Sequence, residues 1–407
     1  MTIKFIQGGV TSPKGFKSSG VHAGIKNFSD KKDLALIVSE KECTAAGVYT
    51  KNLVKSATIF VTKEHLSSGT AQAVIVNSGN ANTCTGQQGY DNAEKMCSLS
   101  AAALNIPAEK VLVASTGVIG VQLNIDAIEK AVPALVDSLN TDGSVDSAVA
   151  IMTTDTFMKT LAVEVELSGK KVTIGAMAKG SGMIHPNMGT MLGFVTTDAN
   201  ISSEMIDKAL KDSVNISYNR ITVDGDTSTN DMVVVLANGL AENTLIDSEN
   251  EDYATFAAAL KAINIELAKM IAKDGEGATK LIECKVINAS NEEEGETLCK
   301  SVISSSLVKA AIFGSDANWG RILCALGYSG VDFDPLKVDL AFSSEAGYIE
   351  VCKDGIPLNF SEELAKKILL EKEITIIADM HAGNAEVTCW GCDLTYDYVK
   401  INGDYRS

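Results

Sequence analysis

The sequence is poor in aromatic residues and in positive charge, and it contains no long apolar run. Aromatic side chains make up 5% of its 407 residues, and 52 acidic residues against 35 basic ones give a net charge of −17. So acidic a chain is badly suited to nucleic acid or to an anionic membrane, because phosphate binding requires a basic surface. No apolar stretch approaches the roughly 18 residues that span a membrane. We therefore expect neither partner.

Signals of export and of a disulfide framework are missing too. The opening MTIKFIQGGVTSPKGF has no apolar core of the signal-peptide kind, so we expect a cytoplasmic protein, and an organellar protein whose leader has been removed would look the same. The nine cysteines are scattered and odd in number, which is typical of buried thiols in a reducing compartment. The CWGC at 389–392 lies in an alternating, strand-like pattern, and no second CxxC completes a zinc site. We interpret it as structural.

The common catalytic motifs are absent as well. The chain has no P-loop, no Rossmann glycine spacing, no HExxH and no GxSxG elbow. Its four histidines show no metal-ligand spacing. We therefore expect no metal ion and no bound cofactor.

Short apolar strands alternate with amphipathic helices along the chain. Residues 161–180 alternate with period two on both sides of Ser168-Gly169, which predicts a hairpin. Further strands are predicted at 32–40, 56–63, 71–79, 191–195, 231–238, 279–288, 336–342, 373–379 and 385–401, and helices at 90–105, 124–139, 202–215, 251–275, 295–312, 318–327 and 361–371. This mixture favours a layered α+β fold over a doubly wound parallel sheet.

The stretch MGTMLGFVTTDAN, residues 188–200, places Thr190 directly after Gly189 and before a buried strand. In such a bond the threonine hydroxyl can attack the preceding carbonyl, and water can then cleave the resulting ester. Glycine leaves that carbonyl unhindered. The new chain would begin at Thr190, whose α-amine has an ordinary pKa of about 7.7–8.0 and can serve as base for its own hydroxyl. A Gly-Thr pair alone is far more typical of an ordinary strand start, because such dipeptides are common.

Three other segments combine hydroxyl, amide and glycine residues near predicted strands. VASTGVIG places Thr116 and Gly117 after an apolar strand, where a backbone N–H can face a ligand. VNSGNANTCTG (76–86) and TVDGDTSTND (222–231) are typical of turns and also of polar sites at strand ends.

These segments belong to a longer series of blocks that resembles one family. The blocks are AAGVYTKN, VNSGNANTCTG, STGVIG, IMTTDTF, MAKGSGMIHPNMGTMLGF, RITVDGDTSTND, DGEGATK, GSDANWGRI and YDYVKINGDYRS, in that order from near residue 8 to 407. They resemble the ornithine acetyltransferases, the bifunctional glutamate N-acetyltransferase and amino-acid acetyltransferase of arginine biosynthesis.

The resemblance implies a layered α/β/β/α fold, similar in outline to N-terminal-nucleophile hydrolases but connected differently. It also implies self-cleavage between Gly189 and Thr190. Residues 1–189 would form an α chain and residues 190–407 a β chain, and two such heterodimers would pair into a heterotetramer of two α and two β chains.

The reaction implied is acetyl transfer from N-acetylornithine to glutamate through an acetyl ester on Thr190. Thr116 and Gly117 match the family's oxyanion hole, and the substrate-binding residues carried over are Thr153, Lys179, Thr190, Glu276, Asn402 and Ser407. Lys179 suits a carboxylate and Glu276 an ammonium group. The family commonly ends in threonine, so Ser407 is a small departure that keeps the hydroxyl. The sequence leaves open whether acetyl-CoA is a second donor.

Two other interpretations remain at this stage. A self-cleaving amidohydrolase or aminopeptidase would use the same threonine with water as acceptor. An uncleaved binding or structural protein would contain Gly189-Thr190 as an ordinary strand start.

Overall fold

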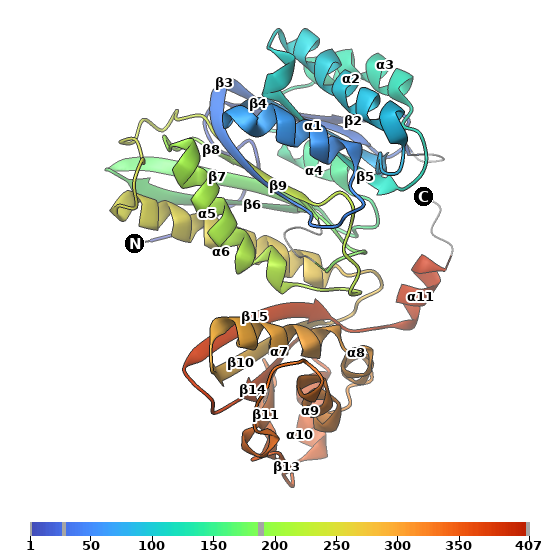
Figure 1. The fold of residues 1–407 in the computed structure, drawn as a ribbon, viewed down its shortest axis with the longest axis vertical. Helices are drawn as coiled ribbons and strands as arrows, with labels where there is room; N and C mark the ends of the chain where they lie inside the picture. Colours follow the sequence, from blue (N-terminus) through green and yellow to red (C-terminus); the bar gives the residue numbers. More distant parts are fainter. Residues whose placement is uncertain (1, 27–29, 186–190, 404–407) are drawn as a thin grey trace.

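The structure is a computed structural model that describes residues 2–26, 30–185 and 191–403, and it has a large and a small lobe (Figure 1). The strands of the large lobe are β1 (Lys4–Ile6), β2 (Phe16–Val21), β3 (Leu34–Tyr49), β4 (Thr70–Asn80), β5 (Val111–Val118), β6 (Lys159–Leu167), β7 (Lys170–Lys179), β8 (Leu192–Thr197) and β9 (Met232–Ala237). Its helices are α1 (Ala57–His65), α2 (Gly86–Leu104), α3 (Ile125–Asp137), α4 (Ser144–Ile151), α5 (Ser203–Asn215) and α6 (Glu251–Lys273).

The small lobe follows in the chain. Its strands are β10 (Leu281–Ala289), β11 (Asp339–Ser344), β12 (Gly347–Lys353), β13 (Ile356–Pro357), β14 (Glu373–Asp379) and β15 (Ala385–Cys392). Its helices are α7 (Glu292–Ser304), α8 (Ser306–Phe313), α9 (Trp319–Gly327) and α10 (Glu362–Leu369), and α11 (Tyr396–Asn402) then leads back toward the large lobe (Figure 1).

The strands of the large lobe form two packed layers that share the long strand β3. The first half of β3 pairs with β2 and β4, a register shift follows between Val38 and Cys43, and the second half pairs with β9. One apolar cluster contains Val74 and Val76 from β4 together with Phe194 from β8 and Val234 from β9. Because these residues come from both layers, this cluster is the core between the two sheets.

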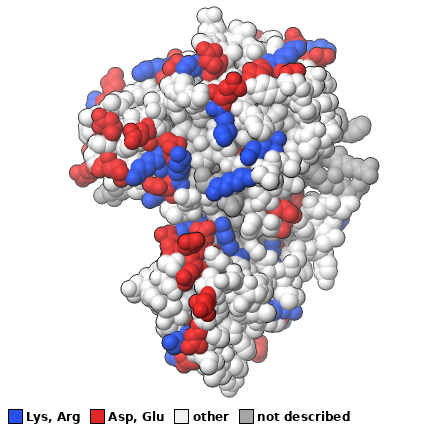
Figure 2. Space-filling model, in the orientation of Figure 1, with Lys and Arg blue, Asp and Glu red and all other residues white. Residues whose placement is uncertain are grey.

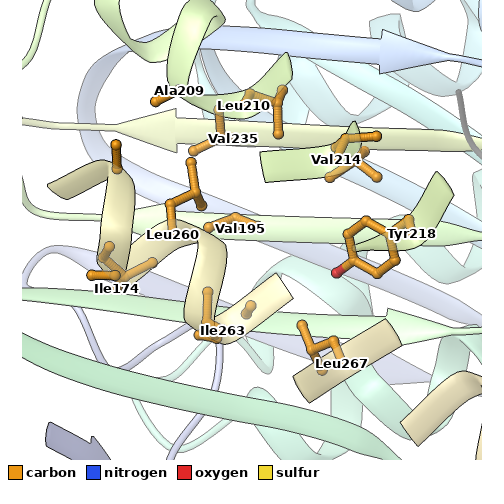
Figure 3. Packing of buried hydrophobic residues seen from close by; sticks show 14 of the residues in the cluster. Ile174, Val195, Ala209, Leu210, Val214, Tyr218, Val235, Leu260, Ile263 and Leu267 are labelled. Carbon is orange, nitrogen blue, oxygen red and sulfur yellow. The ribbon is translucent and has the colours of Figure 1, made fainter. Parts of the chain in front are cut away.

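Helices cover the outer face of each layer. Alternate residues of β4, such as Ile75, pack with α2 and α3 in a separate cluster. On the other side, Val195 and Val235 pack with Leu210 of α5 and Leu260 of α6 (Figure 3). The period-two alternation of the strands thus places one set of side chains between the sheets and the other under helices. The predicted α+β fold with α/β/β/α layers is confirmed.

The small lobe is one mixed sheet covered by helices, with strand order β13-β12-β11-β14-β10-β15 among the described residues. Its core is a cluster contributed by the sheet and by α7 to α10. Trp390 and Cys392 of β15 instead belong to the cluster that contains α6, so this strand joins the two lobes. The CWGC segment lies within β15, and burial raises the pKa of Cys392 to about 11. The structural interpretation of CWGC is confirmed.

Several predicted elements are found with shifted ends, and three predictions are wrong. The hairpin is confirmed as β6 and β7, and the long helix as α6. Residues 56–63, predicted as a strand, form helix α1, whose Thr62 hydroxyl hydrogen-bonds the backbone carbonyl and N–H of Val113. Contacts with β5 therefore outweigh the strand preference of its β-branched residues. The helix predicted at 295–312 is two helices that meet at Ser305, which caps α8.

The strand predicted at 385–401 ends early, at Cys392. The Asp393 carboxylate then accepts hydrogen bonds from the backbone N–H groups of Thr279 and Lys280, at 2.8 and 3.0 Å. These bonds turn the chain out of the sheet, and residues from Tyr396 onward form α11. Asn402 accordingly lies on a helix and not at a strand end.

The distribution of charged side chains on the surface agrees with the acidic composition of the chain. Figure 2 shows basic side chains interspersed with acidic ones on this face, without a continuous basic surface. Over the described ranges, every helix is too short or too polar to cross a lipid bilayer. In the same ranges, no group of three or more His, Cys, Asp or Glu side chains is arranged to hold a metal ion.

The predicted division between residues 189 and 190 falls inside the large lobe. Strand β7 precedes this bond and β8 follows it, and the two pair antiparallel with Lys179 opposite Leu192. The segments 1–189 and 190–407 therefore contribute neighbouring strands to one sheet. Gly189, Thr190 and Ser407 themselves lie outside the described residues.

Candidate active site

The candidate site is a cavity at one edge of the β6–β9 layer. The end of β7 and the starts of β8 and β9 are ladder neighbours there, with Lys179 opposite Leu192 and Leu192 beside Met232. The cavity is lined by Thr116, Gly117, Ile119, Thr153, Thr154, Lys179, Gly182, Met183, Ile184, Met191, Leu192, Ser228, Thr229, Asn230, Asp231, Glu276 and Asn402. It thus gathers every predicted site residue that the structure describes, and it includes Met191, the residue after Thr190.

The backbone at Gly117 requires glycine. Its φ is 133°, and a Cβ built there would lie 2.3 Å from the carbonyl carbon of Gly79 on the neighbouring strand β4. The register between β4 and β5 is irregular at this point. An L side chain would therefore face both strain and overlap. The close approach of two strands brings the Thr116-Gly117 backbone to the cavity wall.

A buried ion network holds three cavity segments together. The Lys159 ammonium, with no exposed surface, lies 2.7 Å from Asp155 Oδ1 and 2.6 Å from Asp274 Oδ2. Asp155 Oδ1 also accepts a hydrogen bond of 2.8 Å from the backbone N–H of Gly180, and the Ser181 hydroxyl donates to the carbonyl of Asp274.

Each member of that network is close in sequence to a residue of the cavity. Asp155 follows Thr153 and Thr154, Gly180 follows Lys179, and Asp274 precedes Glu276 by two residues. Because both carboxylates share one ammonium, the network fixes the three segments relative to one another. Its members lie in the blocks IMTTDTF, MAKGSGM and DGEGATK or beside them.

Lys179 is buried, and its charge is balanced by carboxylates. Burial lowers its pKa, while Asp155, Asp231 and Glu276 oppose that shift and Lys159 adds to it. Burial alone would raise the pKa of Asp155, but Lys179 and Lys159 hold it at about 2. Lys179 Nζ lies 3.4 Å from Thr116 Oγ1 and donates to it. It is thereby the cationic side chain that connects β7 with the Thr116-Gly117 segment across the two layers.

Glu276, in the loop after α6, and Asn402, at the end of α11, form another wall of the cavity. Asn402 Nδ2 donates a hydrogen bond of 2.7 Å to Glu276 Oε2, and the backbone N–H of Glu276 donates to the carbonyl of Ser181. The C-terminal helix thus returns to the large lobe and supplies a polar side chain to the cavity (Figure 1).

The structure adds a group of cavity residues that the sequence analysis did not assign, Ser228 to Asp231. They lie in the TVDGDTSTND segment, whose polar composition was noted as a sign of turns or of sites at strand ends. Asn230 Nδ2 donates to the carbonyls of Ala81 and Ser115, at 2.6 and 2.7 Å. Asn230 therefore supports the residue before Thr116. Thr153 and Thr154 both line the cavity.

Comparison with known proteins gives one consistent result. The ArgJ family model matches residues 17–407. The arginine biosynthesis bifunctional protein ArgJ 1 of Clostridium acetobutylicum is 55% identical over the whole length of both chains, and ArgJ of Symbiobacterium thermophilum is 54% identical, also over both whole chains. The crystal structure of the Bacillus halodurans protein is 52% identical with a TM-score of 0.51, covering 53% of this chain and 99% of that one.

The fold, the cavity and the full-length matches together identify this protein as an acyltransferase of arginine biosynthesis. The chain belongs to the ArgJ family. The resemblance drawn from the sequence blocks is confirmed.

Proposed function

We propose that this protein transfers an acetyl group from N2-acetyl-L-ornithine to L-glutamate, giving L-ornithine and N-acetylglutamate. The observation that carries the proposal is the cavity beside Met191 and Leu192, where Thr116, Gly117, Thr153, Lys179, Glu276 and Asn402 come together. The names of the relatives place their function in arginine biosynthesis, which supports the substrate class.

The proposed activity begins with cleavage of the chain. The Thr190 hydroxyl attacks the carbonyl carbon of Gly189, the amide becomes an ester, and the Thr190 nitrogen becomes a free amine. Water then hydrolyses the ester, which leaves Gly189 with a carboxylate and restores the Thr190 hydroxyl. Nearly all of the solved Bacillus halodurans chain aligns with 53% of this chain, close to the 218 of 407 residues in the segment 190–407. That agreement supports a chain divided near residue 190.

Acetyl transfer then proceeds in two half-reactions. Thr190 Oγ attacks the acetyl carbonyl of N-acetylornithine, its proton passes through the α-amine to the leaving nitrogen, and ornithine departs. The amine of glutamate next attacks the acetyl-Thr190 ester and restores the hydroxyl. Donors from Thr116 and Gly117 would stabilise the oxyanion in both steps, an effect of about 2.7–4 kcal/mol per donor in comparable sites.

The charges of the cavity fit amino-acid substrates. Lys179 offers a buried cation for a carboxylate, and Glu276 offers an anion for an ammonium group. Thr153 and Asn402 add polar contacts, and Ser407 is assigned to the substrate by its match to the family alone. The reaction requires no metal ion and no bound cofactor. Two α and two β chains would assemble into a heterotetramer, which light scattering can test.

The test compares wild type, Thr190→Ala and Thr190→Ser on a denaturing gel and in an assay for N-acetylglutamate. The alanine variant should stay one chain and lose transfer, whereas serine should keep part of both activities because its hydroxyl survives. Thr244→Ala, an exposed threonine, is the matched control and should behave as wild type. Normal transfer by Thr190→Ala would refute the mechanism, and release of acetate without acetylglutamate would indicate an amidohydrolase.

A second arm of the assay addresses the donor. Acetyl-CoA and glutamate are supplied with and without N-acetylornithine. Acetylglutamate formed from acetyl-CoA alone would make the enzyme bifunctional, and its absence would limit the enzyme to recycling acetyl groups.

A further inference from the structure

Asp231 is a buried carboxyl group that the proposed mechanism does not use. It immediately precedes β9, lines the cavity and is 1% exposed. Its Oδ2 is buried and accepts no hydrogen bond from any described residue. A buried oxygen without a hydrogen-bond partner is unfavourable, so its retention in a cavity wall calls for a partner that arrives with the ligand.

The position of Asp231 points to the end of the cavity where the reaction would occur. The Met232 N–H donates to the carbonyl of Met191 at 3.0 Å, so the start of β9 is held against the residue that follows Thr190 in the sequence. Glu276 and Asn402 belong to a different wall, contributed by the loop after α6 and by the end of α11. The cavity therefore has two acidic groups in separate places.

The surroundings of Asp231 disfavour an unpaired negative charge. Burial raises its pKa well above the ordinary value, against the opposing effects of side-chain hydrogen bonds from Ser228 and Thr50 and of the charge of Lys179, and Oδ2 is the oxygen left without a partner. A ligand that brings a positively charged or N–H-bearing group to Oδ2 would relieve this penalty. A ligand carboxylate beside an ionised Asp231 would instead add a second negative charge and increase the penalty.

We propose that Asp231 is a substrate-contacting residue whose Oδ2 accepts a hydrogen bond from the α-nitrogen of the amino-acid substrate. This inference rests on the proposed function, since the α-nitrogen is the atom that carries the acetyl group in N-acetylornithine and receives it in glutamate. It is an amide N–H in the donor and an amine in the acceptor and in ornithine. One acceptor near the reacting atoms would therefore orient it in both half-reactions.

The test uses two probes that differ only in that nitrogen. Ornithine has both amines, whereas 5-aminopentanoate lacks the α-amine and keeps the carboxylate and the distal ammonium. Their affinities are measured by titration calorimetry on the cleaved wild type, Asp231→Asn, Asp231→Ala and the control Asp226→Asn, an exposed residue of the same loop. The ratio of the two affinities within one variant does not depend on how much of the sample is folded.

Wild type and Asp226→Asn should prefer ornithine, and both Asp231 variants should lose about tenfold of that preference, as expected for a hydrogen bond to a charged group. An unchanged ratio, or an equal loss of affinity for both probes, would overturn the inference and leave the proposed function intact. Variants that remain uncleaved would place Asp231 in chain processing and overturn it too. Absence of ornithine binding by wild type would overturn the proposed function, and the inference with it.

Discussion

Both lobes contain buried titratable side chains, beside the cavity in the large lobe and in the core of the small lobe, but these side chains differ in their partners. Beside the cavity of the large lobe, the Lys159 ammonium lies between the carboxylates of Asp155 and Asp274 and pairs with both. In the small lobe, the thiol of Cys299 donates weakly to the carbonyls of Cys284 and Val387. Burial raises the pKa of Cys299 and Cys389 well above the ordinary value.

Burial therefore has opposite chemical consequences in the two lobes. A buried thiol without a cation stays protonated, and so it behaves as a small apolar side chain. A buried carboxylate with two lysines nearby remains ionised and can fix the backbone around it. The large lobe therefore contains, beside the cavity, a charged framework that the buried thiols of the small lobe do not provide. The following variants test that distinction.

The largest effect is expected from Lys159→Met, which should lower the free energy of unfolding. It leaves Asp155 and Asp274 buried without their ammonium partner, which typically costs about 3–5 kcal/mol. The free energy of unfolding in urea measures the loss. Lys171→Met is the matched control, because Lys171 pairs with Glu164 at the surface and its removal should change stability little. Equal stability of the two variants would mean that the buried network does not hold the cavity segments.

The second-largest effect is expected from Gly117→Ala, which should lower kcat. The added Cβ would overlap the Gly79 backbone and displace the Thr116-Gly117 segment from the cavity wall. If this segment supplies an oxyanion donor, kcat should fall about 10²–10³-fold. Gly120→Ala is the control, because its φ is also positive, at 81°, but the added Cβ would meet no heavy atom within 4 Å. A wild-type kcat for Gly117→Ala would remove this segment from the mechanism.

Asn402→Ala should have a moderate effect. It removes the 2.7 Å hydrogen bond to Glu276 and leaves the rest of the cavity unchanged. We expect KM for N-acetylornithine to rise about three- to tenfold, corresponding to about 0.5–1.5 kcal/mol, with kcat largely retained. Lys400→Ala on the same helix, outside the cavity, serves as control and should keep the wild-type KM. The opposite pattern, a lower kcat at unchanged KM, would contradict a binding role.

The smallest effect is expected in chemical labelling of the buried thiols of the small lobe, which should react little in the folded protein. In the native protein, an aromatic disulfide reagent should label the exposed Cys84 and Cys324 quickly and Cys299 and Cys389 only after unfolding. Peptide mapping after a short exposure identifies the labelled sites, and a Cys84→Ser, Cys324→Ser double variant should show no fast labelling. Rapid modification of Cys389 in the folded protein would contradict the contrast between the two lobes.

The sequence predicted the layered α+β fold class because strand alternation and helical periodicity are local signals. It did not predict helix α1, because the choice between helix and strand at residues 56–63 depends on the distant contact between Thr62 and Val113. The turn at Asp393 was missed for a similar reason, since its carboxylate is held by backbone groups more than one hundred residues away.

The candidate site was predicted through family blocks rather than through spacing. The blocks named Thr116, Lys179 and Glu276, and the structure brings these into one cavity. Lys159 lies outside the blocks, and Asp231 ends the block RITVDGDTSTND without an assigned role, because neither residue stands out in its own segment. The role of Lys159 is visible only when two carboxylates from separate segments lie beside it, and that of Asp231 only when its second oxygen is found without a partner.

The antiparallel ladder between β7 and β8 has a consequence for the life of the protein after the proposed cleavage. While the chain is continuous, refolding is a unimolecular event whose rate does not depend on concentration. Once the bond at residue 189 is broken, unfolding releases two polypeptides, each of which exposes a strand edge that only the other can cover. Refolding then requires two separate chains to meet, and aggregation competes with that step. The lifetime of the active enzyme is therefore set by its rate of unfolding.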